Sequence, residues 1–418
     1  MDSTSEPALS NESPKRTWRA SAADKLSRKW WFLDARDLCG RARRRTRLED
    51  FGEPALEPAL PLLVGSLETE ADLRPLGRFL MHVHLQGLLE TRLRLTELWR
   101  KQGDSLNSIP IQRPIFITGM PRSGSTFLHE LLAEDPDNRA PRVWEVMFPV
   151  PRPARTEPDP RIKQAAACLW WFRRFAPQAD AVFPLRACTP HECVAIQSYS
   201  LLSEEFVSTC RIPTYESFLR QADLRPAYAW ERRFLQHLQG RAPARRWVLK
   251  SPDHAYGLGA LFNLFPDALV IQTHRSPFEV LKSSCHLTEV LHGLYAHPTS
   301  PERLAARETR VLAGALNRFI NFRDDHPELS NRFVDVRYHD IISDPLAVIR
   351  RIYHAFGMTL TSQAVEQMRE LADRRTRYGN GRARTAPVDS KLPAIADASS
   401  FNRYCARYHV GWHQSQAR

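Results

Sequence analysis

The sequence lacks long hydrophobic runs and contains few cysteines. No stretch of about 18 consecutive apolar residues is present, so we expect no transmembrane helix. Residues 1–16 are polar and unlike the apolar core of a secretory signal. The seven cysteines are scattered and include no Cys-x-x-Cys pair, which argues against a disulfide framework or a zinc site. These absences predict a reduced, cytoplasmic protein with no bound metal.

Acidic residues are fewer than basic ones. The chain of 418 residues has 59 Lys and Arg against 47 Asp and Glu, which gives a formal net charge of +12. This excess favours an anionic partner, which could be a nucleotide, a nucleic acid or an acidic membrane surface. Hydrophobic residues make up 43% of the chain, enough for a large buried core. We therefore expect a globular protein that binds an anion.

The apolar pattern divides the chain into four parts. Residues 1–20 have no apolar periodicity and are expected to form a disordered tail. Residues 21–109 contain many leucines near helical spacing and predict a helical N-terminal region. Residues 110–360 form the predicted core, and residues 361–418 a helical, basic C-terminal region.

Short apolar runs alternate with helical stretches in the core. Four runs are predicted strands, at residues 115–117, 247–249, 268–271 and 333–336. Each is followed by a predicted helix, at residues 123–132, 256–265, 278–292 and 346–356. This alternation predicts an α/β fold with a P-loop-like parallel sheet flanked by helices. A long insertion at residues 144–245, with proline-rich and aromatic-rich segments, is expected to be helical and to form an acceptor lid.

The loop after the first predicted strand has the composition of a phosphate-binding site. Gly119 and Gly124 allow a tight turn and a close approach to an anion. Ser123, Ser125 and Thr126 add hydroxyl donors at the start of a helix, whose unpaired amide groups also bind anions. The loop therefore predicts a bound phosphate group.

This loop differs from the nucleoside-triphosphate P-loop in the position of its cation. The two glycines have the P-loop spacing, but Ser125 stands at the place of the lysine that neutralises the β- and γ-phosphates. The cationic residue is instead Arg122, on the loop itself. No later predicted strand ends in an aspartate that could hold magnesium. These differences point away from ATP hydrolysis.

The loop and three further motifs resemble the sulfotransferases that use 3′-phosphoadenylyl sulfate (PAPS). The Pro-Arg-Ser-Gly-Ser-Thr sequence at residues 121–126 is similar to the branch that includes tyrosylprotein sulfotransferases and many bacterial enzymes. Arg275 follows a predicted strand and Ser283 comes eight residues later, as in the family's 3′-phosphate motif. Lys250, at the end of a predicted strand, and the segment 139–145 are also similar to family motifs.

The resemblance implies transfer of a sulfonate from PAPS to an acceptor hydroxyl or, less favourably, an amine, with release of adenosine 3′,5′-bisphosphate. It implies that the 5′-phosphosulfate is held by the loop residues Arg122, Ser123, Gly124, Ser125 and Thr126. Lys250 would stabilise the sulfonate or its bridging oxygen, while Arg275 and Ser283 would fix the 3′-phosphate. No metal is expected, because side chains supply the positive charge.

The base that takes the acceptor proton has three candidates. Glu145 comes first, because the tyrosylprotein enzymes carry a glutamate just beyond the donor-loop helix. His254 is second, near the place where cytosolic sulfotransferases carry their catalytic histidine, and His191 with Glu192 is third. Geometry decides among them, since a base has to reach its proton at about 2.6–3.2 Å. The basic segment 379–384 is a further candidate for a nucleotide contact.

Two other functions stay open at this point. A P-loop nucleotide kinase or other phosphotransferase would use the same loop. A basic nucleic-acid or membrane-surface binding protein would use the arginine-rich segments instead. The insertion favours a small or lipid-like hydroxyl compound as acceptor, and it leaves peripheral contact with a membrane open. No nucleic-acid partner is expected, and the sequence indicates no oligomeric state.

Overall fold

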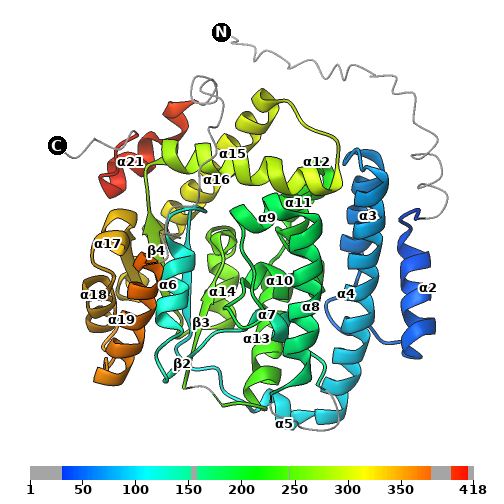
Figure 1. Ribbon diagram of the computed structural model, residues 1–418, viewed down its shortest axis with the longest axis horizontal. Coiled ribbons are helices and arrows are strands. Elements are labelled where there is room, and N and C mark those ends of the chain that lie inside the picture. Colours follow the sequence, from blue (N-terminus) through cyan, green and yellow to red (C-terminus); the bar gives the residue numbers. More distant parts are fainter. Residues whose placement is uncertain (1–30, 152–157, 244, 378–396, 413–418) are drawn as a thin grey trace, which may run out of the picture.

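The computed structural model describes residues 31–151, 158–243, 245–377 and 397–412 (Figure 1). The predicted tail at residues 1–20 and the basic segment 379–384 lie outside the described residues. Among the residues that are described, no helix is both long enough and apolar enough to cross a bilayer.

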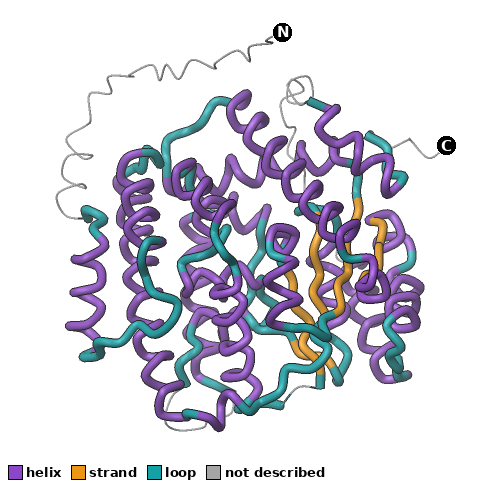
Figure 2. Tube along the Cα trace, turned by 180° about the vertical axis from the view of Figure 1, so that it is seen from behind, coloured by secondary structure: helices purple, strands orange, loops and turns teal. Residues whose placement is uncertain are grey.

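Five parallel strands form a central sheet in the order β2-β3-β1-β4-β5 (Figures 1 and 2). The strands are β1 (Ile115–Gly119), β2 (Asn138–Arg139), β3 (Arg246–Lys250), β4 (Leu269–His274) and β5 (Phe333–Arg337). The four predicted strands and the parallel α/β fold are thus confirmed. The edge strand β2 was not predicted, because two residues are too few to show a pattern.

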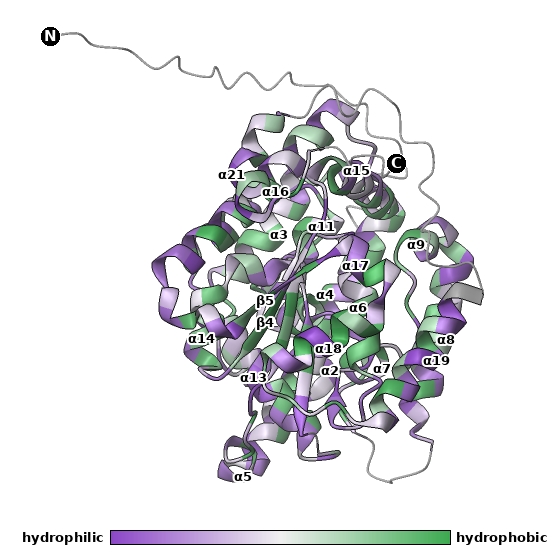
Figure 3. Ribbon diagram, turned by 90° about the vertical axis from the view of Figure 1, so that its left-hand side faces the viewer, coloured by the Kyte–Doolittle hydropathy of each residue, from purple (hydrophilic) through white to green (hydrophobic). Residues whose placement is uncertain are grey.

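Successive residues of the central strands point to opposite faces of the sheet, and both faces are buried. Phe116 of β1 and Val270 of β4 face a large core that includes the N-terminal helices. Their neighbours Ile115, Ile117 and Ile271 face a second core, formed with the helices that follow β1 and β5. All residues of β1 and β4 are buried, which agrees with the hydrophobic strands visible in Figure 3.

The N-terminal region is helical, as predicted. Its helices are α2 (Ala35–Thr46), α3 (Ala59–Thr69), α4 (Pro75–Gln102) and α5 (Asp104–Asn107). The leucines of α4 form one continuous helix, and Leu85, Leu89 and Leu93 lie in its buried stripe. Gly87 lies within α4 and does not interrupt it.

Helices make up the insertion between β2 and β3. They are α7 (Val143–Met147), α8 (Pro160–Phe175), α9 (Pro177–Val182), α10 (Cys193–Gln197), η1 (Ser198–Ser200), α11 (Glu205–Thr209), α12 (Pro213–Gln221) and α13 (Arg225–Gln239). The predicted helical insertion is therefore confirmed. Before it, α6 (Ser125–Leu132) connects the loop after β1 to β2.

The remaining helices follow β3, β4 and β5. They are η2 (Pro252–Tyr256), α14 (Leu258–Leu264), α15 (Pro277–Tyr295), α16 (Pro301–Asp325), η3 (Pro327–Arg332), α17 (Tyr338–Ser343), α18 (Pro345–Ala355), α19 (Ser362–Arg377), η4 (Ala398–Phe401) and α21 (Asn402–Tyr408). The helix α16 was not among the predicted elements.

Many of these helices begin at a proline that follows a capping side chain. Before Pro277, the Ser276 hydroxyl accepts the amide of Glu279, and Ser300 and Asp344 cap α16 and α18 in the same way. Proline suits the first helical position, because an amide hydrogen there would have no partner within the helix and proline has no amide hydrogen. The high proline content thus marks helix starts in this chain.

Candidate active site

The loop between β1 and α6 lies at the carboxyl edge of the sheet. Gly119 ends β1 with a φ of 130°, a value that favours glycine. It also packs tightly against β4, since a Cβ here would lie 2.4 Å from the carbonyl oxygen of Thr273. No larger residue fits this position without moving the strand, so the glycine brings the loop against the end of β4.

The backbone of the loop is shaped to bind an anion. Arg122 and Gly124 both have left-handed conformations, with φ values of 64° and 87°. Gly124 precedes the first residue of α6 and places no side chain on the helix start. Such a turn, followed by uncapped amide groups at a helix N-terminus, forms a concave site for phosphate.

The Ser123 hydroxyl joins the loop to the neighbouring strand. It lies 2.6 Å from the Thr273 hydroxyl of β4 and 2.5 Å from the carbonyl oxygen of Met120. Because Ser123 is fully buried, its hydroxyl is used inside the chain. Ser125 and Thr126 lie in the first turn of α6, as predicted from the sequence.

Three residues of the predicted donor site meet at this loop. Arg122 Nε donates to Ser283 Oγ at 3.0 Å, and Arg122 Nη1 donates to the carbonyl oxygen of Val182 at 3.1 Å. Arg275 Nη1 donates to the Arg122 carbonyl oxygen at 2.7 Å. The fold therefore brings Arg122, Arg275 and Ser283 together from β1, β4 and α15.

The two arginines make this place strongly electropositive. Burial and the nearby Arg275 charge lower the pKa of Arg122, which forms no ion pair with a carboxylate of the described residues. The Arg275 guanidinium lies 4.1 Å from the centre of the Tyr338 ring, and its ion pair with Glu279 is long, at 3.9 Å. Its buried Nε has no hydrogen-bond partner. Two adjacent cations with so little compensation fit an anionic ligand.

Lys250 lies at the same edge of the sheet. It is the last residue of β3 and pairs with Ile117, two residues before Gly119 on β1. Its side chain is buried, and its ammonium group donates to the carboxylate of Glu192. Glu192 immediately precedes α10, so the insertion supplies a carboxylate to the end of β3.

The segment containing His191 and Glu192 is held by backbone contacts. The His191 amide donates to the Pro141 carbonyl oxygen at 2.7 Å, and Pro190 forms a bridge with Arg142. Burial lowers the pKa of His191, so its ring is neutral at pH 7. These contacts fix the position of Glu192 beside Lys250.

Glu145, the first candidate for the base, uses both carboxylate oxygens inside the fold. Its Oε2 accepts the Arg142 amide at 2.9 Å, which forms part of a capping box at the start of α7. Its Oε1 accepts Arg139 Nη2 at 2.5 Å. This arrangement fastens α7 to β2.

His254, the second candidate, belongs to the core beneath the sheet edge. Its Nδ1 lies 2.8 Å from the Tyr228 hydroxyl, and its ring meets the edge of Phe116 at 5.0 Å between centroids. One of its ring nitrogens lies within 4.8 Å of ligand-type atoms of Cys193 and Glu231. Burial lowers the pKa of His254 to about 3 and raises that of Glu231 to about 7. His254 is therefore a neutral member of a buried polar cluster.

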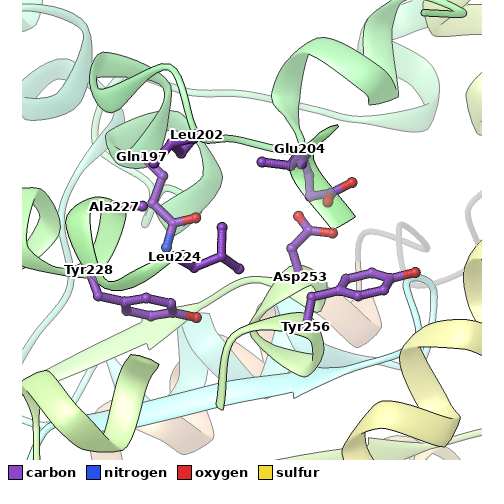
Figure 4. A pocket seen from close by; sticks show the side chains of 9 residues that line it. Gln197, Leu202, Glu204, Leu224, Ala227, Tyr228, Asp253 and Tyr256 are labelled. Carbon is purple, nitrogen blue, oxygen red and sulfur yellow. The ribbon is translucent and has the colours of Figure 1, made fainter. Parts of the chain in front are cut away.

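A small cavity between the insertion helices and η2 is lined by a carboxylate that the sequence analysis missed, Asp253. Figure 4 shows Asp253 directed toward Glu204 across this cavity, with Tyr228 and Tyr256 beside it. Its other lining residues are Gln197, Leu202, Leu219, Leu224 and Ala227. Burial and the negative charge of Glu192 raise the pKa of Asp253 to about 6. Only its place three residues after Lys250 could have drawn attention to it.

Residues 114–362, more than half of the chain, match the sulfotransferase family. The chain therefore belongs to this family and is a sulfotransferase, and the parallel sheet and the electropositive loop described above are in keeping with it.

The proteins to which this chain is similar include several mycobacterial sulfotransferases. The chain is 27% identical over 312 residues to omega-hydroxy-beta-dihydromenaquinone-9 sulfotransferase Stf3 of Mycobacterium bovis and of Mycobacterium tuberculosis, over 70% of this chain and 76% of each relative. It resembles the crystal structure of sulfotransferase STF1 from Mycobacterium tuberculosis, with a TM-score of 0.75 and 32% identity over 81% of this chain and 93% of that one. For sulfotransferase STF9 from Mycobacterium avium the TM-score is 0.75 and the identity 25%, over 91% and 97% of the two chains.

Proposed function

We propose that this sulfotransferase moves the sulfonate of PAPS to a hydroxyl group, or less favourably an amine, of a small lipid-like acceptor. The observation that carries the proposal is the meeting of Arg122, Arg275 and Ser283 at the start of α6. These groups come from three distant parts of the chain and provide positive charge beside a phosphate-shaped loop. PAPS carries phosphates at both its 5′ and 3′ positions, so it offers anionic groups to both arginines.

Each residue of the donor site has a distinct role in this proposal. Arg122 and the amide groups of Gly124, Ser125 and Thr126 hold the 5′-phosphosulfate, while Ser123 fixes the loop to β4 and offers its own amide. Arg275 and Ser283 hold the 3′-phosphate. Arginine suits this task because its planar fork binds oxyanions at two points and keeps its charge.

Lys250 and Glu192 form the reacting pair in this proposal. Lys250 contacts the sulfonate and stabilises the charge that develops on the leaving phosphate oxygen. Glu192 takes the proton of the acceptor hydroxyl as the acceptor oxygen bonds to sulfur and the bond between sulfur and the 5′-phosphate oxygen breaks. The side chains supply the positive charge, so the proposal includes no metal. Glu192 replaces Glu145 and His254 as the proposed base, because those two side chains are engaged in a helix cap and in the core.

The proposed acceptor class rests on two observations. The mycobacterial relative Stf3 is named for a hydroxylated menaquinone, which is a lipid-like hydroxyl compound. The cavity that Asp253 lines, three residues after Lys250 in the chain, has leucines and tyrosines together with carboxylates in its wall, so part of this wall is apolar.

Binding of adenosine 3′,5′-bisphosphate tests the donor assignment. We expect the bisphosphate to raise the melting temperature of the protein, because it is the product of transfer from PAPS and carries both phosphates. ATP with magnesium at the same concentration should have little effect, since the loop lacks the P-loop lysine. Stabilisation by ATP and magnesium alone would favour a nucleotide kinase. Stabilisation by nucleic acid, with a steep dependence on salt, would favour a basic nucleic-acid binding protein.

Replacing Glu145 with glutamine tests the alternative base. We expect the free energy of unfolding to fall by about 1–2 kcal/mol, because the helix cap and its charge-assisted bonds are weakened. The kcat should stay within about tenfold of the original value, since the carboxylate takes no proton. Urea unfolding and steady-state kinetics measure the two effects. A loss of kcat of about 10²–10⁴-fold, with normal stability, would return the role of base to Glu145.

A further inference from the structure

Helix α8 exposes a cluster of large aromatic side chains to solvent. Trp170, Trp171 and Phe175 have exposed fractions of 53%, 55% and 77%. The two indoles contact each other edge to face at 4.7 Å between centroids, and Trp171 stacks on Phe175 at 5.7 Å. These contacts leave most of the aromatic surface uncovered. Contiguous exposed aromatic surface of this kind marks an interaction site.

The same helix buries very little of itself. Its buried positions are Arg161, Ala165 and Leu169, which form one narrow stripe at four-residue spacing. The stripe packs against the neighbouring insertion helices, and the rest of α8 faces outward at the edge of the molecule (Figure 3). An ordinary core helix would place its tryptophans in the stripe and its small alanines outside. Here the tryptophans are outside.

The charge of α8 has one sign. Within Pro160–Phe175 there are basic residues and no Asp or Glu. Lys163, Arg173 and Arg174 form no ion pair with a carboxylate of the described residues. The two arginines lie between the exposed aromatic residues in sequence, so cationic and aromatic groups share one end of the helix.

We propose that the exposed face of α8, consisting of Trp170, Trp171, Arg173, Arg174 and Phe175, binds the surface of an anionic lipid bilayer. Tryptophan and phenylalanine insert into the interface between headgroups and acyl chains, and arginines beside them contact anionic headgroups. The net charge of +12 adds a long-range attraction to such a surface.

This docking face is connected directly to the donor loop. After α8 the chain turns into α9, whose last residue is Val182. The Val182 carbonyl oxygen accepts a hydrogen bond from Arg122, the proposed ligand of the phosphosulfate. Helix α9 also packs against α15, which carries Ser283. A bilayer bound at α8 therefore lies next to the segment that borders the reaction site, and this geometry suits an acceptor that resides in the lipid. This last step rests on the proposed function, whereas the docking itself does not.

Vesicle co-sedimentation tests the docking face. We expect the protein to bind vesicles of phosphatidylcholine and phosphatidylglycerol, and to bind pure phosphatidylcholine vesicles much less. The triple variant Trp170→Ser, Trp171→Ser, Phe175→Ser should weaken the partition to anionic vesicles by about tenfold or more, because the inserting rings are lost. The double variant Arg173→Gln, Arg174→Gln should weaken it mainly at low salt. The control variant Val83→Ser, Ile342→Ser removes exposed aliphatic side chains of α4 and α17 and should bind like the original protein.

Binding of adenosine 3′,5′-bisphosphate to the same variants keeps the two proposals separate. An unchanged bisphosphate shift in melting temperature shows that the triple variant is folded, and loss of vesicle binding then supports the docking face. Equal vesicle binding by the triple variant and the original protein would overturn it. A third outcome would also overturn the docking face. If neither the original protein nor the triple variant binds vesicles, and the original is a dimer while the variant is a monomer, the aromatic face of α8 binds a second copy of the chain instead. Failure of the bisphosphate to bind any variant would instead count against the proposed donor.

Discussion

Replacing Arg122 with alanine is expected to lower kcat/KM at least about 10²-fold, because the cation that we propose to hold the phosphosulfate is lost. The removal also breaks the hydrogen bonds to Ser283 and Val182, so affinity for adenosine 3′,5′-bisphosphate should fall as well. The change removes a cation whose pKa is lowered by burial and by the nearby Arg275 charge, so we expect no loss of thermal stability. Steady-state kinetics with PAPS and calorimetric titration with the bisphosphate measure both effects.

The exposed Arg100 of α4 provides a matched control. It pairs only with Glu97 at the surface, and Arg100→Ala should keep the original kinetics. Arg122→Lys should recover part of the lost activity, since it restores the charge without the two-point geometry. Near-normal turnover in Arg122→Ala would remove Arg122 from the donor site.

The second large effect is expected at the Lys250–Glu192 pair. Lys250→Ala should lower kcat about 10²-fold or more, because it removes the charge that stabilises the leaving oxygen. Glu192→Gln should lower kcat about 10²–10⁴-fold, because it removes the proposed base. The kcat of the double variant should be only slightly lower than that of the less active single variant, since the two groups act in the same step. Glu192→Gln should leave the bisphosphate affinity unchanged, since Glu192 makes no contact with the proposed donor.

An exposed ion pair of the same composition serves as the control for these variants. Lys101 and Glu97 lie 3.1 Å apart on α4, and the changes Lys101→Ala and Glu97→Gln should leave kcat unaffected. Lys250 is buried, so Lys250→Ala leaves Glu192 without its cation, and circular dichroism has to show that this variant is folded. Normal kcat in Glu192→Gln, together with a large loss in Asp253→Asn, would assign the proton transfer to Asp253.

Much of the fold could be predicted from short-range patterns. The strands β1, β3, β4 and β5 are runs of apolar residues buried on both faces, so their sequence is distinctive. The helix α16 could not be recognised in the same way. Its buried stripe includes the charged Glu308, which pairs with Arg307, and this interrupts the apolar periodicity.

The candidate site could be predicted only where a motif carries it. The residues of the loop indicate an anion site by themselves, whereas the pair Arg275 and Ser283 is predicted from the resemblance to the family's motif. The structure brings this pair together with Arg122. The environment of the carboxylates could not be read from the sequence. The raised pKa of Asp253 depends on burial and on Glu192, which lies far from it in sequence. Glu145 belongs to a capping box that could not be recognised from the sequence, because its N-cap residue is Arg142 and not the usual serine or threonine.

The hydrogen bond between Arg275 and the Arg122 carbonyl oxygen spans 153 residues of the chain. Its two partners are adjacent only because β1 and β4 are neighbours, and β4 is made long after β1 during synthesis. The anion site therefore does not exist in any early, locally folded part of the chain, since forming it requires closure of a very long loop. Acquisition of donor binding during refolding would report the moment at which the two halves of the sheet join.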